Sequence, residues 1–182
     1  MSQLQIKKLT NTAIIPTRGS DGAAGFDLYA DSVEGQVSIA TEKDGSQTVI
    51  CGGGSNIKIH TGIAMAIPKG YVGLLFARSG LSCKQGLRPA NCVGVIDEDY
   101  RGEIIVQLYN DADFAKFYNA DTKIGNTSLK NNDVSEQFST FKLHDRVAQM
   151  VFVKYEAFDT IEVDELDNTI RGENGFGSTG TN

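Results

Sequence analysis

Three consecutive carboxylates near the middle of the chain are the first candidates for chemistry. Asp97 to Asp99 are followed by Tyr100 and Arg101, Gly102 ends the group, and Ile96 precedes it. A ring and a branched side chain set among acids are what the wall of a ligand pocket contains. A solvated turn is the alternative, because charged residues are common at the tips of hairpins. This stretch alone leaves both interpretations open.

A second candidate is the tripeptide that begins at Arg78, directly after the apolar run Tyr71–Ala77. Ser79 suits the N-cap of a short helix, and Gly86 suits the residue that follows its last turn. A strand that runs into a capped helix brings backbone N–H groups, a hydroxyl and a guanidinium to one point. Phosphate fits such a point. The alternative is a capped turn on the surface without a ligand.

Two polar residues interrupt otherwise apolar predicted strands. Asp27 lies in the alternating stretch 25–30, where it either faces solvent or is held at an interface or near a metal. Gln149 lies in the apolar stretch 146–153, and a buried amide must be hydrogen-bonded. Its partner is either an internal group or a ligand.

The last residues of the chain combine glycines with groups that bind nucleotides. Residues 171–182 have the composition of a flexible tail. They also hold an arginine, a phenylalanine among glycines, and paired hydroxyls. Those groups suit a segment that folds over a nucleotide, with N–H groups and hydroxyls on phosphates and the ring on a base.

The elements that must position these candidates are predicted to be strands. Residues 103–109 alternate between two faces with a period of two, and residues 94–96 lead into the acidic turn as the other arm of a hairpin. Many short strands with turns between them indicate an all-β barrel or sandwich. The other predicted strands cover residues 4–9, 25–30, 33–40, 48–51, 56–67, 71–77, 146–153 and 161–166.

Length and composition limit the class of protein. A chain of 182 residues predicts one domain over 1–182. The polar composition of about 111–145 predicts a long surface segment there, and the composition of the last residues predicts a flexible arm, taken as 168–182. A net charge of −6 argues against a nucleic-acid partner, and no apolar run reaches the length of a membrane span. Three cysteines without C-x-x-C spacing predict neither disulfides nor zinc, and favour a reduced cytoplasmic location.

Five stretches, in this order along the chain, closely resemble the trimeric dUTPase family. The resemblance spans Leu4 to Gly180 except for 111–142, and it does not account for that segment. Independent turns would not recreate five motifs in the family's order at nearly the usual gaps. The five are AAGFDLYA (23–30), ARSGLSCKQGL (77–87), NCVGVIDEDYRGEIIVQLYN (91–110), DRVAQMVF (145–152) and RGENGFGSTG (171–180).

The resemblance implies a jelly-roll-like β-barrel subunit that forms a homotrimer with active sites at subunit interfaces. It implies hydrolysis of dUTP to dUMP and pyrophosphate, with Mg²⁺ bound to the triphosphate. Asp97 matches the general base that activates water for attack on the α-phosphorus, and Asp27 matches the acid linked to Mg²⁺ through water. Tyr100 matches the ring under the deoxyribose. The other matches are Asn91, Gly94, Val95 and Ile96 for uracil, Arg78, Ser79, Gly80 and Gln149 for phosphates, and Arg171, Phe176, Gly177, Ser178 and Thr179 in the closing arm.

Two alternatives stay open beside the dUTPase. A dCTP deaminase, or a bifunctional deaminase–dUTPase, shares the fold but needs a catalytic glutamate and a cytosine-reading pocket near Val95–Asp97. A dUTP-sensing protein would bind the nucleotide and act on a protein partner through the segment at 111–145. Pyrophosphate release separates the enzyme from the sensor.

Overall fold

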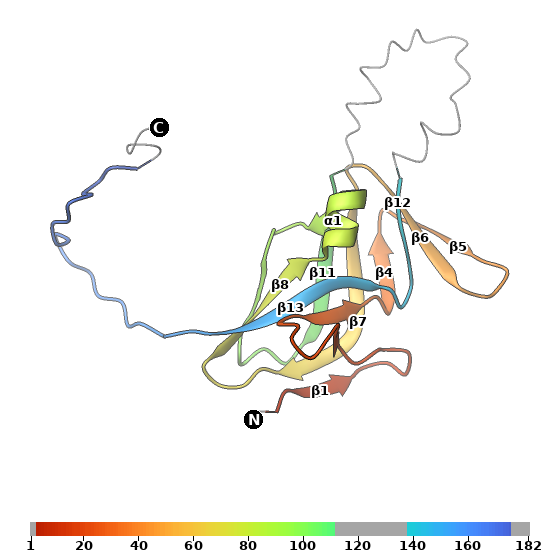
Figure 1. Cartoon of the computed structure of the whole chain (residues 1–182), viewed down its shortest axis with the longest axis horizontal. Coiled ribbons are helices and arrows are strands. Elements are labelled where there is room, and N and C mark those ends of the chain that lie inside the picture. Colours follow the sequence, from red (N-terminus) through yellow and green to blue (C-terminus); the bar gives the residue numbers. More distant parts are fainter. Residues whose placement is uncertain (1–2, 112–137, 176–182) are drawn as a thin grey trace, which may run out of the picture.

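The computed structural model describes residues 3–111 and 138–175, which form strands and one short helix (Figure 1). The all-β prediction is confirmed. The elements are β1 (Gln5–Lys8), β2 (Thr17–Arg18), β3 (Phe26–Tyr29), β4 (Ser32–Gly35), β5 (Ser38–Thr41), β6 (Gln47–Gly52), β7 (Asn56–Ala66), β8 (Tyr71–Ala77), α1 (Ser79–Gln85), β9 (Leu87–Pro89), β10 (Gly94–Ile96), β11 (Glu103–Asn110), β12 (Phe138–Lys142) and β13 (Arg146–Lys154).

The strands form three antiparallel sheets. The first has the order β1-β7-β11-β9, with β4 also paired to the long strand β7. The second has the order β10-β8-β13-β3-β2, and the third has the order β12-β6-β5. Strands distant in the sequence are therefore neighbours in space, as in a jelly-roll-like barrel.

The core is built by the alternation that predicted the strands. Along β7, Ile57 and Ile59 are fully buried while Lys58 between them is exposed. Leu28 of β3 and Met150 of β13 belong to the same hydrophobic cluster. Each such buried side chain stabilises the fold by about 1.5–3 kcal/mol relative to exposure. The second sheet is therefore a firm support for the polar residues at its ends.

The expected hairpin around the acidic turn is wrong. β10 pairs with β8, whereas β11 pairs with β7 and β9, so the residues between them connect two different sheets. Alternation predicts that a segment is a strand, but it does not specify its partner. The acidic turn is thus a crossing between sheets rather than a hairpin tip.

The polar excursion expected over 111–145 ends earlier than its composition predicts. Phe138–Lys142 form β12, which pairs with β6, and Ser139 and Phe141 are buried. Five alternating residues at the end of a long polar stretch gave too weak a pattern to be recognised. The rest of the segment, 112–137, lies outside the described residues.

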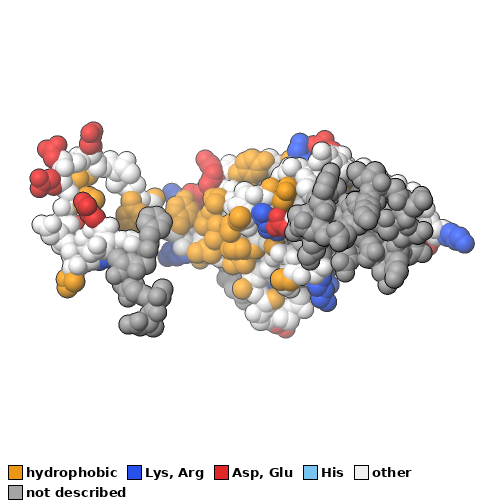
Figure 2. All heavy atoms as spheres, turned by 90° about the horizontal axis from the view of Figure 1, so that it is seen from above, with side chains coloured by type: hydrophobic (Ala, Val, Ile, Leu, Met, Phe, Trp, Pro, Cys, Tyr) orange, Lys and Arg blue, Asp and Glu red, His pale blue; other side chains and the backbone are white. Residues whose placement is uncertain are grey.

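The strand predicted over 161–166 is also wrong. After β13 the chain extends away from the barrel without a strand, and its side chains are exposed (Figure 1). Figure 2 shows this tail apart from the body of the molecule, with acidic and hydrophobic side chains both uncovered. Phe158, Ile161 and Leu166 are 79%, 83% and 85% exposed. A β-strand needs a neighbouring strand to pair with, and this apolar stretch has none beside it among the described residues.

Among the helices that the structure describes, none has the length and apolar character needed to cross a membrane.

Candidate active site

Asp27, Arg78 and Arg146 form a compact ionic group, called here the anion cluster. Arg78 Nε lies 3.0 Å from Asp27 Oδ1, and Arg146 Nη1 lies 3.3 Å from Asp27 Oδ2. Arg78 Nη1 also donates to the Arg146 carbonyl at 3.1 Å. The Asp27 side chain is 13% exposed, whereas those of Arg78 and Arg146 are 28% and 48% exposed. The carboxylate is therefore covered while both guanidiniums still reach solvent.

The central strands of the second sheet bring the anion cluster together. Asp27 of β3 lies opposite Gln149 of β13, and Gln149 lies opposite Phe76 of β8. Arg78 follows β8 directly, and Arg146 begins β13. Gln149 Nε2 donates to the Ala77 carbonyl at 3.0 Å, so its amide has an internal partner. Three motifs far apart in the sequence thus converge at one end of this sheet.

The helix after Arg78 differs slightly from its prediction. Its N-cap is Arg78, in an extended conformation without a side-chain cap, and Ser79 is the first helical residue. Ser79 and Gly80 are exposed beside the anion cluster. Gly86 ends the helix with φ 72°, in the left-handed region that glycine adopts readily, as predicted. Arg78 is extended because it still continues the backbone of β8.

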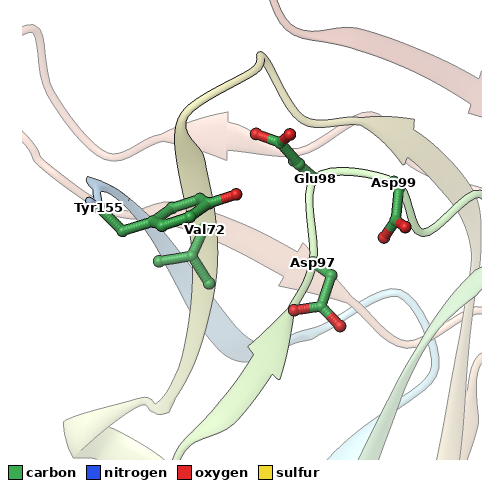
Figure 3. A pocket seen from close by; sticks show the side chains of 5 residues that line it. All are labelled: Val72, Asp97, Glu98, Asp99 and Tyr155. Carbon is green, nitrogen blue, oxygen red and sulfur yellow. The ribbon is translucent and has the colours of Figure 1, made fainter. Parts of the chain in front are cut away.

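The acidic turn, Asp97 to Gly102, lies beside a surface pocket. The pocket is lined by Val72, Tyr155 and the three acids of the turn (Figure 3). The turn is held there by Glu98, whose carboxylate accepts a hydrogen bond from the backbone N–H of Gly70. Partial removal from water, followed by the negative charge of Glu98, raises the pKa of Tyr155 above its usual value. Asp97 itself is exposed, directly after β10.

The far end of the acidic turn is anchored through Tyr100 and Glu103. The Tyr100 hydroxyl donates to the Glu103 carbonyl at 3.0 Å, and the Tyr100 residue stays 42% exposed. Glu103 Oε1 accepts from the backbone N–H of Gly62 at 2.8 Å, and Oε2 lies 2.8 Å from His60 Nδ1. These bonds fix the start of β11 and leave the Tyr100 ring available to a ligand.

Strand β10 presents main-chain groups at the edge of the second sheet. It pairs only with β8 among the described strands, which leaves its other side open. Val95 is 62% exposed, and Asn91 lies in the turn just before the strand. A Cβ on Gly94 would lie 3.2 Å from Leu75 Cβ, so glycine lets β10 approach β8 closely. An open strand edge is suited to reading the edge of a base through backbone donors and acceptors.

The two groups of predicted site residues lie at opposite ends of β8. Ile96, just before Asp97, is in register with Gly73, whereas Arg78 follows Ala77. Five residue steps along the strand separate Gly73 from Arg78, which is roughly 16 Å at about 3.3 Å per residue. Within one chain, Asp97 therefore cannot reach a phosphate bound by Arg78.

The described part of the C-terminal arm, residues 168–175, contacts neither group. Arg171 lies in the exposed tail after β13, where its Nε donates to the Asn174 carbonyl at 2.9 Å. The remaining predicted arm residues, Phe176, Gly177, Ser178 and Thr179, lie outside the described residues.

A metal site built by the protein alone is absent from the part of the chain that the structure describes, since no three His, Cys, Asp or Glu residues gather for one there. Asp27 contributes a single carboxylate near two arginines. That donor set fits Mg²⁺, which usually keeps several waters and is bound by one or two carboxylates together with substrate phosphates.

Arg146 is the site residue that sequence reasoning missed. It stands in the stretch DRVAQMVF beside Gln149, yet it reads as an ordinary charge at the start of a strand. A bulge between Arg146 and Ala148 changes the register with β3 and allows Arg146 to reach Asp27. The change of register has no signature in the sequence.

Comparison with known proteins agrees with the motifs. The dUTPase family model matches residues 11–126 and 129–180. A deoxyuridine 5'-triphosphate nucleotidohydrolase from Corynebacterium glutamicum is 37% identical, over 99% of this chain and 96% of its own length. One from Paramecium bursaria Chlorella virus 1 is 36% identical, over 99% of both chains.

Solved structures show the same architecture. The dUTPase of Staphylococcus bacteriophage 80alpha with dUPNHPP is similar with a TM-score of 0.74 and 28% identity, over the whole of both chains. A mutant dUTPase from phage phi11 of S. aureus, described with a structural Mg(II) ion, has a TM-score of 0.63 and 26% identity, over 90% of this chain and 98% of its own.

Proposed function

The chain belongs to the dUTPase family and hydrolyses dUTP to dUMP and pyrophosphate, and we propose that it does so at sites shared between the subunits of a homotrimer. The observation that carries this proposal is the separation of Asp97 from the anion cluster along β8. A head-to-tail arrangement places one end of a subunit against the opposite end of the next, and such rings close with cyclic symmetry. The acidic turn of one subunit then faces the anion cluster of another.

Asp97 is the general base in this proposal. It is exposed at the end of β10, and its carboxylate has no hydrogen-bond or ion-pair partner among the described residues. A carboxylate without such partners can accept a proton from a water whose oxygen lies at about 2.6–3.2 Å. That water attacks the α-phosphorus, and pyrophosphate leaves. Phosphoryl transfer of this kind depends mainly on positioning and charge stabilisation.

The base and sugar are read by the strand that leads to Asp97. Backbone groups on the open edge of β10, with Asn91, would hydrogen-bond the edge of uracil. Val95 and Ile96 would form the wall of the uracil site along this strand edge. The exposed ring of Tyr100 would lie under the deoxyribose. A ribose 2′-hydroxyl would meet that ring. Specificity for uracil over cytosine follows from the backbone pattern of donors and acceptors, and such polar pockets discriminate strongly.

The triphosphate is bound by Arg78, Ser79, Gly80 and Gln149. The two arginines of the anion cluster supply positive charge that is still accessible to solvent. Mg²⁺, when bound to the nucleotide, supplies further charge neutralisation, and Asp27 is the residue that would hold it through water.

The rest of the chain completes or surrounds this site. Arg171, Phe176, Gly177, Ser178 and Thr179 would close over the nucleotide bound by another subunit, since the tail extends away from its own barrel. We propose that 1–182 is a single dUTPase domain. Its segment 112–137 would be a surface insertion that can contact a partner protein. Three free cysteines, two of them exposed, suit a reducing compartment such as the cytoplasm.

A substrate comparison tests the proposed function. Pyrophosphate release should be fast with dUTP and Mg²⁺ and slow with dCTP, dTTP and UTP. Ammonia release from dCTP would indicate a deaminase instead, and dUTP binding without pyrophosphate release would indicate a sensor. A monomer in light scattering that is fully active would contradict the shared site.

A further inference from the structure

Glu98 follows the proposed base directly, and its side chain bonds outside the acidic turn. Its carboxylate accepts a hydrogen bond from the backbone N–H of Gly70, in the turn between β7 and β8. Its main-chain carbonyl accepts from Arg101 Nη1 at 2.6 Å. Glu98 is half-buried, whereas Asp97 and Asp99 on either side of it are exposed. Within the described chain, Glu98 is thus the one acid of this turn whose carboxylate is bonded to another element.

Gly70 is a fixed point because the main chain holds it on both sides. Its carbonyl accepts from the backbone N–H of Tyr155 at 3.1 Å, just after β13 ends. The N–H of Tyr71, which begins β8, donates to the Pro68 carbonyl at 3.1 Å. Gly70 itself has φ 79°, in the left-handed region that glycine adopts readily. The donor that Glu98 uses therefore belongs to the end of a sheet rather than to a free loop.

Asp97 lies between two attachments to the start of β8. The residue before it, Ile96, is in register with Gly73 of that strand. The residue after it, Glu98, is bonded to Gly70, just before the strand begins. Both neighbours of the base are therefore held by one short segment of chain. A bond to Glu98 can fix the direction of Asp97 without any contact between Glu98 and the substrate.

The carboxylates of Glu98 and Asp97 point in different directions (Figure 3). That of Glu98 points toward the hydroxyl end of Tyr155, and that of Asp97 points away from both. Burial, followed by the charge of Glu98, raises the pKa of Tyr155, so its hydroxyl keeps its proton beside the carboxylate at neutral pH. Glu98 is thus engaged by the protein, while Asp97 is left for water.

We propose that Glu98 is a positioning residue for the general base, and that its bond to Gly70 fixes the direction in which Asp97 meets the attacking water. The inference rests on the proposed function, because it concerns the same base. It assigns Glu98 an effect on turnover rather than on nucleotide affinity, since it acts through Asp97.

Turnover and binding are measured separately on the intact oligomer. Turnover is pyrophosphate release from dUTP with Mg²⁺, and affinity is measured by calorimetric titration of the α,β-imido analogue of dUTP. Glu98→Ala removes the bond to Gly70 and should lower kcat at least about tenfold, because a misdirected reacting group is costly. Affinity for the analogue should stay within about threefold of wild type, since the residues proposed to bind the nucleotide are unchanged.

Two conservative variants separate the hydrogen bond from the charge. Glu98→Gln keeps the length of the side chain and an oxygen that can accept from Gly70, and should retain kcat within about threefold of wild type. Glu98→Asp keeps the charge on a shorter side chain, and should lower kcat about fivefold or more. Asp99→Ala removes a neighbouring charge from the same turn and should leave kcat near wild type. Should Glu98→Ala fail to form the oligomer, a higher kcat for Glu98→Gln than for Glu98→Asp supports the role of the bond.

The outcomes distinguish this inference from the function on which it rests. Wild type that releases no pyrophosphate from dUTP, or Asp97→Asn with full turnover, would overturn the proposed base and this inference together. If those results hold as proposed, a wild-type kcat for Glu98→Ala would overturn the positioning role alone. Equal losses of kcat and affinity by Glu98→Ala would also overturn it, because they would indicate a general disruption of the site. A fast Glu98→Asp beside a slow Glu98→Gln would show that charge, rather than the bond to Gly70, is responsible.

Discussion

The two ends of β8 balance their charges in opposite ways. At the Arg78 end, the carboxylate of Asp27 contacts two guanidiniums, so each charged group has a charged partner. At the other end, the acidic turn concentrates three carboxylates. The guanidinium of Arg101 in that turn donates to the carbonyls of Glu98 and Tyr100 rather than to an acid.

This difference indicates what each end contributes to the reaction. The anion cluster is ordered in advance and retains excess positive charge, which suits a phosphate that only has to be held. The acidic turn keeps Asp97 unengaged among other acids, which suits a base that must be free to take a proton. Each end lacks what the other supplies, and in the proposed shared site they meet only between two subunits.

Asp97→Asn is the strongest test of the role assigned to the acidic turn. Removing a positioned general base should reduce the turnover of dUTP by about 10²–10⁴-fold, while nucleotide affinity changes little. Steady-state pyrophosphate release and calorimetric titration measure the two quantities. Asp99→Asn removes the same charge from the same turn and is the matched control, with turnover expected near wild type. A loss below about fivefold for Asp97→Asn, with the fold intact, would place the base elsewhere.

Mixing two inactive variants tests whether the two ends belong to different subunits. Arg78→Ala disables the anion cluster, and Asp97→Asn disables the base at the other end of β8. Subunits exchanged after denaturation and refolding should regain about a quarter of wild-type turnover at equal amounts, because that share of shared sites combines two intact halves. Each parent treated alone provides the control. No recovery, with mixed oligomers confirmed by mass spectrometry, would show that each site lies within one chain.

The sequence predicts the strands that carry the residues at both ends of β8, but not which strands pair with one another. A continuous apolar run identified the strand at 71–77, and alternation identified the strand that holds Asp27, because burial on one face leaves a period of two. The partner of β10 and the register shift that directs Arg146 to Asp27 depend on contacts between distant segments. The tail was misread at 161–166 because exposed apolar residues there imitate a strand. A shared site likewise has no signature within a single chain.

A smaller effect is expected at His60, which supports the acidic turn without belonging to it. The hydrogen bond to Glu103, and secondarily the contact of its Nε2 with Glu34 at 3.5 Å, raise the pKa of His60. Glu34 is itself paired with Lys58. A raised folded-state pKa stabilises the protein below the unfolded value of about 6.5, and this contribution is lost as pH rises through the folded pKa.

His60→Gln should therefore lower the free energy of unfolding more at pH 6 than at pH 8. We expect a difference below about 1 kcal/mol, since the pair is partly exposed. Denaturant unfolding at one protein concentration measures it, and affinity for the imido analogue serves as a control that should not change. An equal or larger decrease in the free energy of unfolding at pH 8 would contradict the ionic role of His60.

The smallest effect is expected from the segment 112–137, whose two flanks meet beside α1 rather than at either end of the site. The backbone N–H of Asp111 donates to the Gly86 carbonyl at 2.9 Å, and that of Thr140 donates to Gln85 Oε1 at 2.8 Å. The flanks thus contact adjacent residues, so a short link can join them while β12 is kept.

Loop-closure entropy changes by only about 0.6 kcal/mol per doubling of length, so shortening the segment should not harm the fold. Replacing 112–137 with a short Gly/Ser link should keep the oligomer and leave dUTP turnover within about tenfold of wild type. The change in loop-closure free energy is too small to account for a tenfold change in turnover by itself. Turnover that collapses while light scattering shows the oligomer intact would mean that this segment reaches the shared site.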